Sequence, residues 1–284
     1  MTNLVRSIAA SLVATALATP VVAAFPEKPV TMIVPFAAGG PTDTLARSIA
    51  QSMSVVLKQT VVVENVAGAG GTVGANRVAK AKPDGYTVLL HHIGMATAPA
   101  LYRHLPYNAQ SDFEPVGLVA DVPMTVIARG NFAANNFREF LTYIKANKTK
   151  VSYANAGIGS ASRLCGMLVM SAIETDLLTV PYKGTGPAMN DLLGGQVDFL
   201  CDQTINTTSQ IRGGKVKAFG VTTRTRVASL KDIPTLDEQG LKDFEVSVWH
   251  GVYAPKGGTE RSPRHFAAWP AGRPAGRQRQ SAFG

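Results

Sequence analysis

Short apolar segments alternate with helix-like segments along most of the chain. The apolar runs occupy residues 30–36, 60–66, 86–92, 150–155, 177–182, 196–202 and 215–223. The helical patterns lie at Thr42–Lys58, at Val73–Ala81, from about Ala161, from about Pro187, and briefly after Asp202. Apolar strands separated by amphipathic helices are typical of parallel sheets that helices cover on both faces. The pattern therefore predicts an α/β fold.

The alternation is interrupted in the middle of the chain and again near its end. Residues 112–129 read as two extended runs with a proline between them, and residues 244–255 are again extended. Extended segments without a following helix indicate a crossing between two α/β lobes and a crossing back. We therefore expect one lobe from residues 25–123 with 249–260, a second lobe from 124–248, and a cleft between them.

The first residues have the pattern of an export signal. Arg6 precedes an apolar stretch from Ile8 to about Leu17, and Val22-Ala23-Ala24 is a small-x-small cleavage pattern. A buried N-terminal helix is the alternative, but Arg6 in front and Pro20 behind suit a signal better. We expect residues 1–24 to be a signal peptide cleaved after about Ala24, and the mature protein to be exported.

The net charge of +9 is concentrated at the two ends of the chain. Residues 1–24 carry one Arg and no acid, and residues 261–284 carry five Arg and no acid, which leaves +3 for residues 25–260. This excess is too small and too scattered for a surface that follows a phosphate backbone. We therefore expect no nucleic acid partner.

Two glycine-containing loops join a strand to a helix in a way that suits an anion. The first is "VPFAAGGPTD", where Gly39 and Gly40 permit close approach of the backbone and Pro41 begins a helix without losing a hydrogen bond. The second is "YANAGIGSASRL", which carries glycines and two serines at a helix start. Each loop offers free N–H groups at a helix N-terminus, and an ordinary βα turn is the alternative for either one alone.

Other motifs give weaker indications. Residues 68–74, "GAGGTVG", resemble a dinucleotide fingerprint, but the spacing is wrong and Asp84 precedes the next strand instead of ending it. His91 and His92 are adjacent, so on a strand we expect them to point to opposite faces. No Cys/His cluster has zinc spacing, and "GIGSAS" is not a hydrolase elbow. We expect neither a metal nor a cofactor.

The chain has two cysteines, Cys165 and Cys201. In an exported protein they can form one disulfide, because the compartment is oxidising. The alternative is a pair of small buried apolar side chains. The sequence leaves both open.

Several segments in the same order resemble the Bug-type periplasmic solute-binding proteins of tripartite tricarboxylate transporters. They include "PFAAGGPTDTLAR", "VVVENVAGAGGTVGANRVAKAKPDGYTVLL", "LPYNAQSDFEPVGLV", "YANAGIGSASRLCG", "VPYKGTGPAMNDLLGGQVDFLCDQT" and "IPTLDEQGL". The resemblance runs from about Phe25 to Lys256. It implies a two-lobed Venus-flytrap receptor, each lobe a mainly parallel sheet, that captures a small carboxylate and delivers it to membrane permease subunits. We expect a periplasmic monomer whose ligand is a dicarboxylate, tricarboxylate, aromatic acid or amino acid.

The resemblance also implies which residues hold the ligand, largely through backbone amides and ordered water. The expected ligand-binding residues are Phe36, Ala37, Ala38, Gly39, Gly40, Asp43, His92, Gly94, Gly157, Gly159, Ser160, Ala161, Tyr182, Lys183, Asp202 and Gln203. Asp43 either braces its own loop or, like Asp202, meets a ligand ammonium. An exported α/β enzyme that uses His92, Cys201 or Asp202 on a carboxylate is the alternative function, although no nucleophile–base pattern supports it.

The resemblance stops before the C-terminal tail. Residues 261–284 contain no Leu, Ile, Val, Met, Asp, Glu or Lys and show no periodic apolar face. The composition resembles translation in a shifted reading frame, and a genuine basic tail is the alternative. We expect residues beyond about Glu260 to be disordered and the first lobe to expose apolar surface that helices cover in the family.

Overall fold

The computed structural model describes residues 25–258, so the expected signal peptide and the atypical tail lie outside the described residues. The helices are α2 (Pro41–Leu57), α3 (Thr72–Ala79), α4 (Gly94–Leu101), α5 (Phe137–Ala146), α6 (Ala161–Ala172), α7 (Thr185–Leu193) and α8 (Thr204–Arg212), with the 3-10 turns η1 (Ala69–Gly71) and η2 (Ala228–Leu230). The strands are β1 (Val30–Val34), β2 (Val61–Asn65), β3 (Thr87–His92), β4 (Phe113–Arg129), β5 (Ser152–Asn155), β6 (Leu178–Pro181), β7 (Phe199–Gln203), β8 (Val216–Val221) and β9 (Ser247–Pro255).

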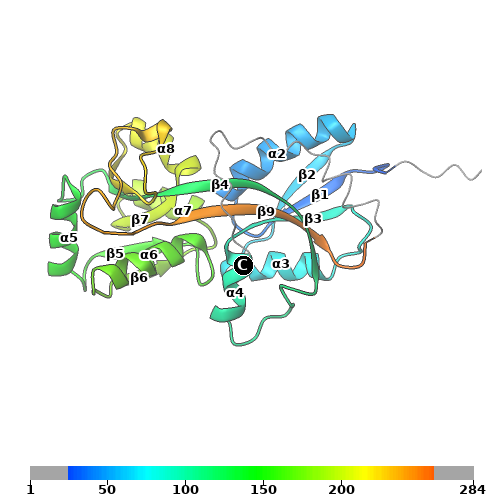
Figure 1. Cartoon of the computed structure of the whole chain (residues 1–284), viewed down its shortest axis with the longest axis horizontal. Helices are drawn as coiled ribbons and strands as arrows, with labels where there is room; N and C mark the ends of the chain where they lie inside the picture. The colour runs from blue at the N-terminus through cyan, green and yellow to red at the C-terminus, as the bar shows by residue number, and fades with distance from the viewer. Residues whose placement is uncertain (1–24, 259–284) are drawn as a thin grey trace, which may run out of the picture.

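Two α/β lobes are joined by β4 and β9, which run side by side across the molecule (Figure 1). In the first lobe β1 pairs in parallel with β2 and β3. In the second lobe β5 pairs in parallel with β6 and β7. The strand order is β2-β1-β3-β9-β4-β7-β5-β6, with β8 paired to β4. The predicted α/β class and two-lobed architecture are confirmed.

The long strand β4 changes partners where it passes from one lobe to the other. It pairs antiparallel with β9 from Phe113 to Pro123 and with β7 and β8 from Met124 onward. Val122 lies opposite Val248 at this change. The two extended runs expected over residues 112–129 are therefore one strand, because Pro123 lies in the register with β9 without interrupting the strand.

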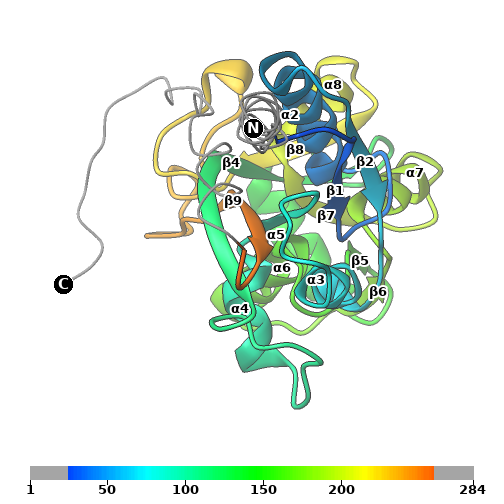
Figure 2. The same cartoon turned by 90° about the vertical axis from the view of Figure 1, so that its right-hand side faces the viewer.

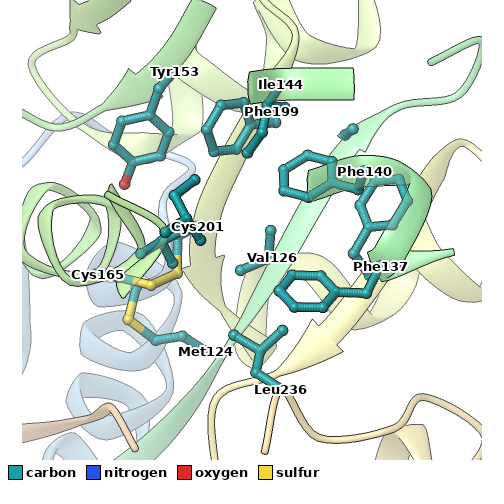
Figure 3. Packing of buried hydrophobic residues seen from close by; sticks show 14 of the residues in the cluster. Met124, Val126, Phe137, Phe140, Ile144, Tyr153, Cys165, Phe199, Cys201 and Leu236 are labelled. Carbon is teal, nitrogen blue, oxygen red and sulfur yellow. A yellow bond between two sulfur atoms is a disulfide. The ribbon is translucent and has the colours of Figure 1, made fainter. Parts of the chain in front are cut away.

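Each lobe has its own apolar interior on both faces of its sheet. In the first lobe the alternate side chains of β1 pack toward different helices: Met32 toward α2 residues such as Ile49, and Ile33 toward α3 residues such as Val78. This alternation follows from the two-residue period of a strand. The interior of the second lobe contains a cluster of phenylalanines, in which Phe140 stacks on Phe219 at 4.5 Å. Figure 3 shows Phe140 and Phe199 of this cluster, whose ring centroids are 5.3 Å apart. Burial of these side chains holds each lobe together.

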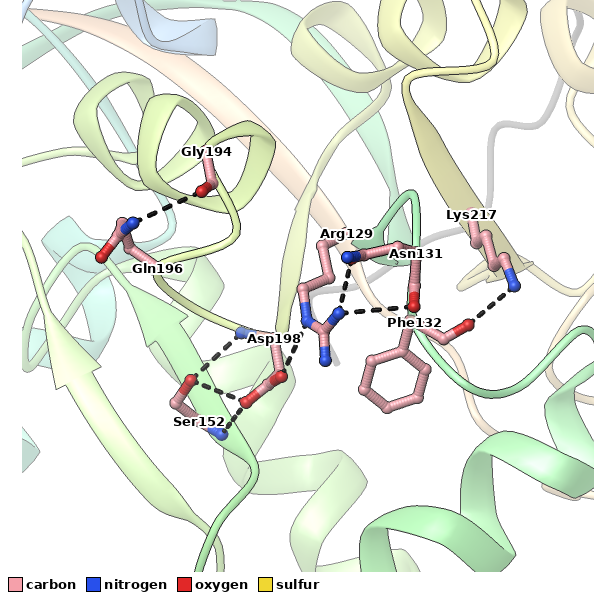
Figure 4. A network of polar contacts seen from close by, with 8 residues as sticks. All are labelled: Arg129, Asn131, Phe132, Ser152, Gly194, Gln196, Asp198 and Lys217. Atoms are coloured by element: carbon pink, nitrogen blue, oxygen red, sulfur yellow. Dashed lines mark hydrogen bonds and ion pairs between the residues drawn. The ribbon is translucent and has the colours of Figure 1, made fainter.

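A polar network closes the end of the second-lobe sheet (Figure 4). The Asp198 carboxylate accepts hydrogen bonds from Arg129 Nε at 3.0 Å and from the N–H and hydroxyl of Ser152 at 2.8 and 3.0 Å. Ser152 begins β5 and Asp198 directly precedes β7, so the network lies at the amino ends of these strands. The opposite, carboxyl ends are left for the interlobe region, where parallel sheets bind ligands.

Two helices were not expected from the sequence. Helix α5 begins at a true cap, since the Asn136 side chain accepts a hydrogen bond from Glu139 N. Helix α4 has no such cap and carries Pro99 inside. Figure 2 shows α4 below the first-lobe sheet. Among residues 25–258, no helix has the length and apolar character needed to cross a membrane.

Exposed apolar side chains occur in both lobes. Val55 is 76% exposed in the first lobe and Leu178 is 54% exposed in the second. Exposure within the described residues is therefore not confined to the first lobe. The expected effect of the tail on the first lobe stays a prediction.

Candidate functional site

A narrow cleft with about 20 Å³ of free volume lies between the lobes, and its lining comes from both of them. The first lobe contributes Phe36, Gly40, Pro41, Thr42 and His92, and the second contributes Ala156, Ser160, Ala161, Ser162, Thr185, Asp202 and Gln203. Among these lining residues there is no Lys or Arg. Among the groups that line the cleft, backbone N–H groups are therefore the source of positive potential.

Four helices begin at the cleft. The N-cap or first residues of α2, α6, α7 and α8 all belong to its lining. The first N–H groups of a helix have no partner within the helix, and the aligned peptide dipoles place about half a positive charge there. Four such ends converging on one space form an environment for an anion such as a carboxylate.

The loop before α2 is shaped by glycine and braced by Asp43. Gly39 has φ of +79°, and its N–H donates to Asp43 Oδ2 at 3.0 Å. The carboxylate also accepts hydrogen bonds from Arg47 at 3.0 Å and from Asn65 at 2.9 Å. Burial raises the pKa of Asp43, but these hydrogen bonds outweigh it and hold the pKa below its usual value. Asp43 braces its loop through these partners, and its place among the ligand-binding residues stays a prediction.

The loop before α6 uses two serines differently. The Ser160 hydroxyl donates to Gly157 O at 2.7 Å and accepts from Arg163 N at 3.2 Å, so it caps the helix. The Ser162 hydroxyl accepts from Ala156 N at 2.9 Å and lies 3.2 Å from Ser160 Oγ. Because the Ser160 proton serves Gly157 O, Ser162 is the donor in the contact between the two hydroxyls, and a ligand would have to take the Ser162 proton from Ser160 Oγ.

Two buried histidines of the first lobe, His92 and His250, are neutral and have defined tautomers. His92 Nδ1 accepts from Gly94 N at 2.9 Å, so its proton is on Nε2. His250 Nδ1 faces Val248 O at 3.1 Å and must donate, which leaves Nε2 to accept from Thr42 Oγ1 at 3.4 Å. Burial lowers the pKa of His92 well below its usual value and that of His250 to about 4.

The expectation that His91 and His92 point to opposite faces is wrong. Their ring centroids are 4.9 Å apart, and both rings contact Phe36, at 5.7 and 4.6 Å. His92 is the last residue of β3, and its N–H donates to His91 Nδ1 at 2.8 Å. Burial, followed by the nearby His250, lowers the pKa of His91 to about 3.

Two hydrogen-bond acceptors of the cleft lining, Asp202 and Gln203, lie at the end of β7 in the second lobe. Asp202 is 1% exposed and accepts from Asn206 Nδ2 at 2.6 Å. Burial raises its pKa to about 6, against the lowering effect of hydrogen bonds from Asn206, Gln203 N and Thr185, and no cationic side chain of residues 25–258 is among the causes. Gln203 Oε1 is buried without a hydrogen-bond partner in this part of the chain.

The cleft brings together only some of the residues expected from the sequence. Those that line it are Phe36, Gly40, His92, Ser160, Ala161, Asp202 and Gln203. Those that do not are Ala37, Ala38, Gly39, Asp43, Gly94, Gly157, Gly159, Tyr182 and Lys183. Most of the second group shape or join the loops that carry the first group.

Several of these residues join the two lobes at the rim of the cleft. Ala37 N donates to Lys183 O across the cleft at 3.0 Å. The Tyr182 hydroxyl is occupied by Asp191 at 2.6 Å, which explains why it is not available to a ligand. A Cβ built on Gly94 would lie 2.5 Å from Gly159 O, so here too the two backbones meet. The described structure therefore has its lobes in contact.

Five lining residues were absent from the expected set: Pro41, Thr42, Ala156, Ser162 and Thr185. Four of them lie next to expected residues in the two anion loops, so the loop pattern carried the signal. Thr185 follows Gly184 at the start of α7 and its hydroxyl hydrogen-bonds Asp202. The segment "YKG" before Thr185 could have predicted a helix start there, and so a place for Thr185 in the cleft.

The structure joins Cys165 and Cys201 in a disulfide, with Cα atoms 6.2 Å apart (Figure 3). This bond ties α6 to β7 within the aromatic core of the second lobe. While so bonded, Cys201 has no thiol to act as the nucleophile of the alternative enzyme. Among the described residues, no cluster of His, Cys, Asp or Glu could hold a metal ion.

Comparison with known proteins places the chain. Residues 45–264 match the model of the tripartite tricarboxylate transporter family receptor. The chain belongs to this receptor family. A relative from Agrobacterium vitis, the UPF0065 protein in the TAR-I ttuE-ttuC' intergenic region, is 53% identical over 82% of this chain and 67% of its own length.

Solved proteins of similar sequence have the same fold. The periplasmic binding protein BugD is 59% identical with a TM-score of 0.84, covering 85% of this chain and 81% of its own. MatC from Rhodopseudomonas palustris with bound malate is 41% identical with a TM-score of 0.83, covering 86% and 83%. One of these similar structures thus contains a bound carboxylate, malate.

Proposed function

We propose that the protein is a periplasmic solute-binding receptor that captures a small carboxylate between its lobes and delivers it to the membrane permease of a tripartite tricarboxylate-type transporter. The observation that carries the proposal is the convergence of four helix N-termini on a cleft whose lining has no cationic side chain. Backbone N–H groups suit a carboxylate, and the family description agrees.

The lobes in this proposal comprise residues 25–123 with 249–260 and residues 124–248. The change of β4 partners at Pro123 and Met124 supports this division. Ligand release requires the lobes to separate by a hinge motion in β4 and β9 near Val122 and Val248. Small-angle scattering should show a smaller radius of gyration at ligand saturation than without ligand, and an identical radius would contradict closure.

The acceptors at the end of β7 favour a carboxylate that also carries a hydrogen-bond donor. Asp202 has no cationic partner among the described residues, and Gln203 Oε1 has no partner at all there. A ligand ammonium or hydroxyl would satisfy these acceptors while the carboxylate meets the helix ends.

Titration calorimetry with succinate, malate and aspartate tests the ligand class. The three have the same carbon chain and differ only in a hydrogen, a hydroxyl or an ammonium at one carbon. We expect affinity to rise in that order, by about tenfold or more from succinate to aspartate. Adipate, citrate and benzoate extend the panel, and absence of binding by every acid would contradict the receptor proposal. Ligand recovered unchanged after incubation separates a receptor from an enzyme.

A further inference from the structure

The glycine-rich segment that resembles a dinucleotide fingerprint contributes nothing to the cleft lining. It forms η1 and the start of α3, with φ of +62° at Gly70. A Cβ built on Gly70 would lie 1.5 Å from Ile158 O. The first-lobe backbone therefore meets the second-lobe backbone at a point where no side chain fits.

Tyr102 covers the same point from the end of α4. Its hydroxyl lies 2.7 Å from Ala69 O in its own lobe and 2.7 Å from Ile158 O in the other. A hydroxyl has one proton, which these two carbonyls share. The ring also lies against the loop, because a Cβ on Gly159 would be 3.3 Å from Tyr102 Cε2.

Ile158 belongs to the loop that precedes α6, and the start of α6 lines the cleft. Ile158 lies between Gly157 and Gly159, which have φ of +89° and +86°, and two residues before the N-cap Ser160. The Ile158 side chain is 54% exposed, so its carbonyl makes these contacts and its side chain contributes little. Contact at Ile158 O thus positions the loop whose next residues line the cleft.

We propose that Gly70 and Tyr102 form a closure latch that grips Ile158 O and sets how fast bound ligand leaves. They are positioning residues, since neither lines the cleft. This inference rests on the proposed capture of a carboxylate between the lobes. Opening separates Ile158 from both residues, whereas the Tyr102 hydroxyl keeps Ala69 O as a partner within its own lobe. The donor is therefore already oriented when the lobes close again.

Replacing the hydroxyl tests the hydrogen-bond part of the latch. For Tyr102→Phe we expect malate to dissociate about fivefold faster in stopped-flow fluorescence, with an unchanged association rate. Tyr86→Phe is the matched control, because the Tyr86 hydroxyl accepts from Glu27 N at 2.9 Å within the first lobe and away from the cleft. Equal dissociation rates for wild type and Tyr102→Phe would overturn the role of the hydroxyl.

Replacing the glycine tests the backbone contact. Gly70→Ala places a methyl group on Ile158 O, so we expect at least about tenfold weaker malate binding. Gly214→Ala is the control, since Gly214 has φ of +63° and no atom within 4 Å of an added Cβ. It carries the same backbone strain without the clash, and thermal unfolding of both variants checks that they fold.

The outcomes separate the latch from the function on which it rests. If wild-type protein binds malate or another acid of the panel and both latch variants keep its dissociation rate, the latch alone is overturned. If wild-type protein binds no carboxylate, the proposed function fails and the latch fails with it. Faster dissociation in the two latch variants and in neither control supports the latch.

Discussion

Near the cleft the two lobes differ in their buried titratable groups: the first lobe has histidines beside the ion-paired Asp43, and the second lobe has a carboxyl with no ion pair among residues 25–258. The first lobe holds three neutral imidazoles, with the pKa of His91 lowered by burial to about 3 and that of His250 to about 4. The second lobe holds one carboxyl, Asp202, whose pKa burial raises to about 6. Both lobes supply positive potential to the cleft through helix N-termini. Of the described residues that line the cleft, only those of the second lobe include a carboxyl. This difference teaches that such a receptor can orient a ligand without a cationic side chain.

The largest expected difference between the lobes is in stability after loss of the disulfide. Cys165 and Cys201 are 36 residues apart, and opening a loop of this length costs about 4 kcal/mol of unfolding free energy in the chain-entropy account. Both cysteines lie in the second lobe, so reduction or paired replacement by Ala should weaken mainly that lobe. Hydrogen exchange resolved by peptide measures it, and equal loss of protection in the two lobes would contradict the comparison.

Acid should weaken the first lobe while the second gains from Asp202. Because the imidazole pKa values are lowered in the folded protein, the unfolded chain binds more protons than the folded chain below pH 6.5. The stability that the neutral histidines contribute is therefore present above pH 6.5 and is lost as the pH falls toward the folded-state pKa. At pH 5 the loss is about 2 kcal/mol for each of His91 and His250. Because the pKa of Asp202 is raised, its effect on the unfolding free energy is the opposite. Its stabilising contribution is present below about pH 3.8 and is lost as the pH rises through about 6.

Hydrogen exchange at pH 7 and pH 5, corrected for intrinsic rates, compares the two lobes directly. We expect peptides of β1 and β3 to lose protection at pH 5 and peptides of β5 and β7 to keep theirs. Loss confined to the second lobe would reverse the assignment of the buried groups.

The sequence predicted the alternation of elements well because the signal is local. The helix expected over Thr42–Lys58 is α2 (Pro41–Leu57), where glycine and proline mark the start. Helix α5 was missed although Asn136 and Glu139 carry a capping signal. Helix α4 has little amphipathic character and an internal proline, so no periodicity could reveal it.

The site was less accessible from the sequence because its chemistry depends on contacts between distant residues. The carboxylates of Asp43 and Asp202 look equivalent in the chain, yet Arg47 and Asn65 occupy one while burial raises the pKa of the other. The resemblance found the loops, whereas only the structure distinguishes residues that line the cleft from those that join the lobes. The role of Gly70 against Ile158 is likewise a contact across 88 positions that no local pattern carries.

Replacing Asp202 should act on ligand selectivity more than on ligand binding in general. For Asp202→Asn we expect about 30-fold weaker binding of aspartate, because an ammonium loses its charged partner, and a much smaller change for succinate. In the wild type, aspartate affinity should also fall as the pH drops below about 6, where Asp202 becomes protonated. Calorimetry between pH 5 and 8 measures both effects, with exposed Asp176→Asn as the control. An unchanged ratio of aspartate to succinate affinity would show that Asp202 does not meet the ligand.

The smallest expected effect distinguishes the two serines of the second-lobe anion loop. The Ser162 hydroxyl lines the cleft and can turn its proton from Ser160 Oγ to a ligand carboxylate, so Ser162→Ala should weaken malate binding about fivefold. Ser160→Ala removes the cap of α6 and should lower the unfolding free energy by about 1 kcal/mol, with a smaller direct effect on the ligand. Calorimetry and thermal unfolding of both variants, with Ser171→Ala on the exposed part of α6 as control, separate the two roles. If Ser160→Ala weakens binding more than Ser162→Ala at equal stability, the assignment of the hydroxyl protons in this loop is wrong.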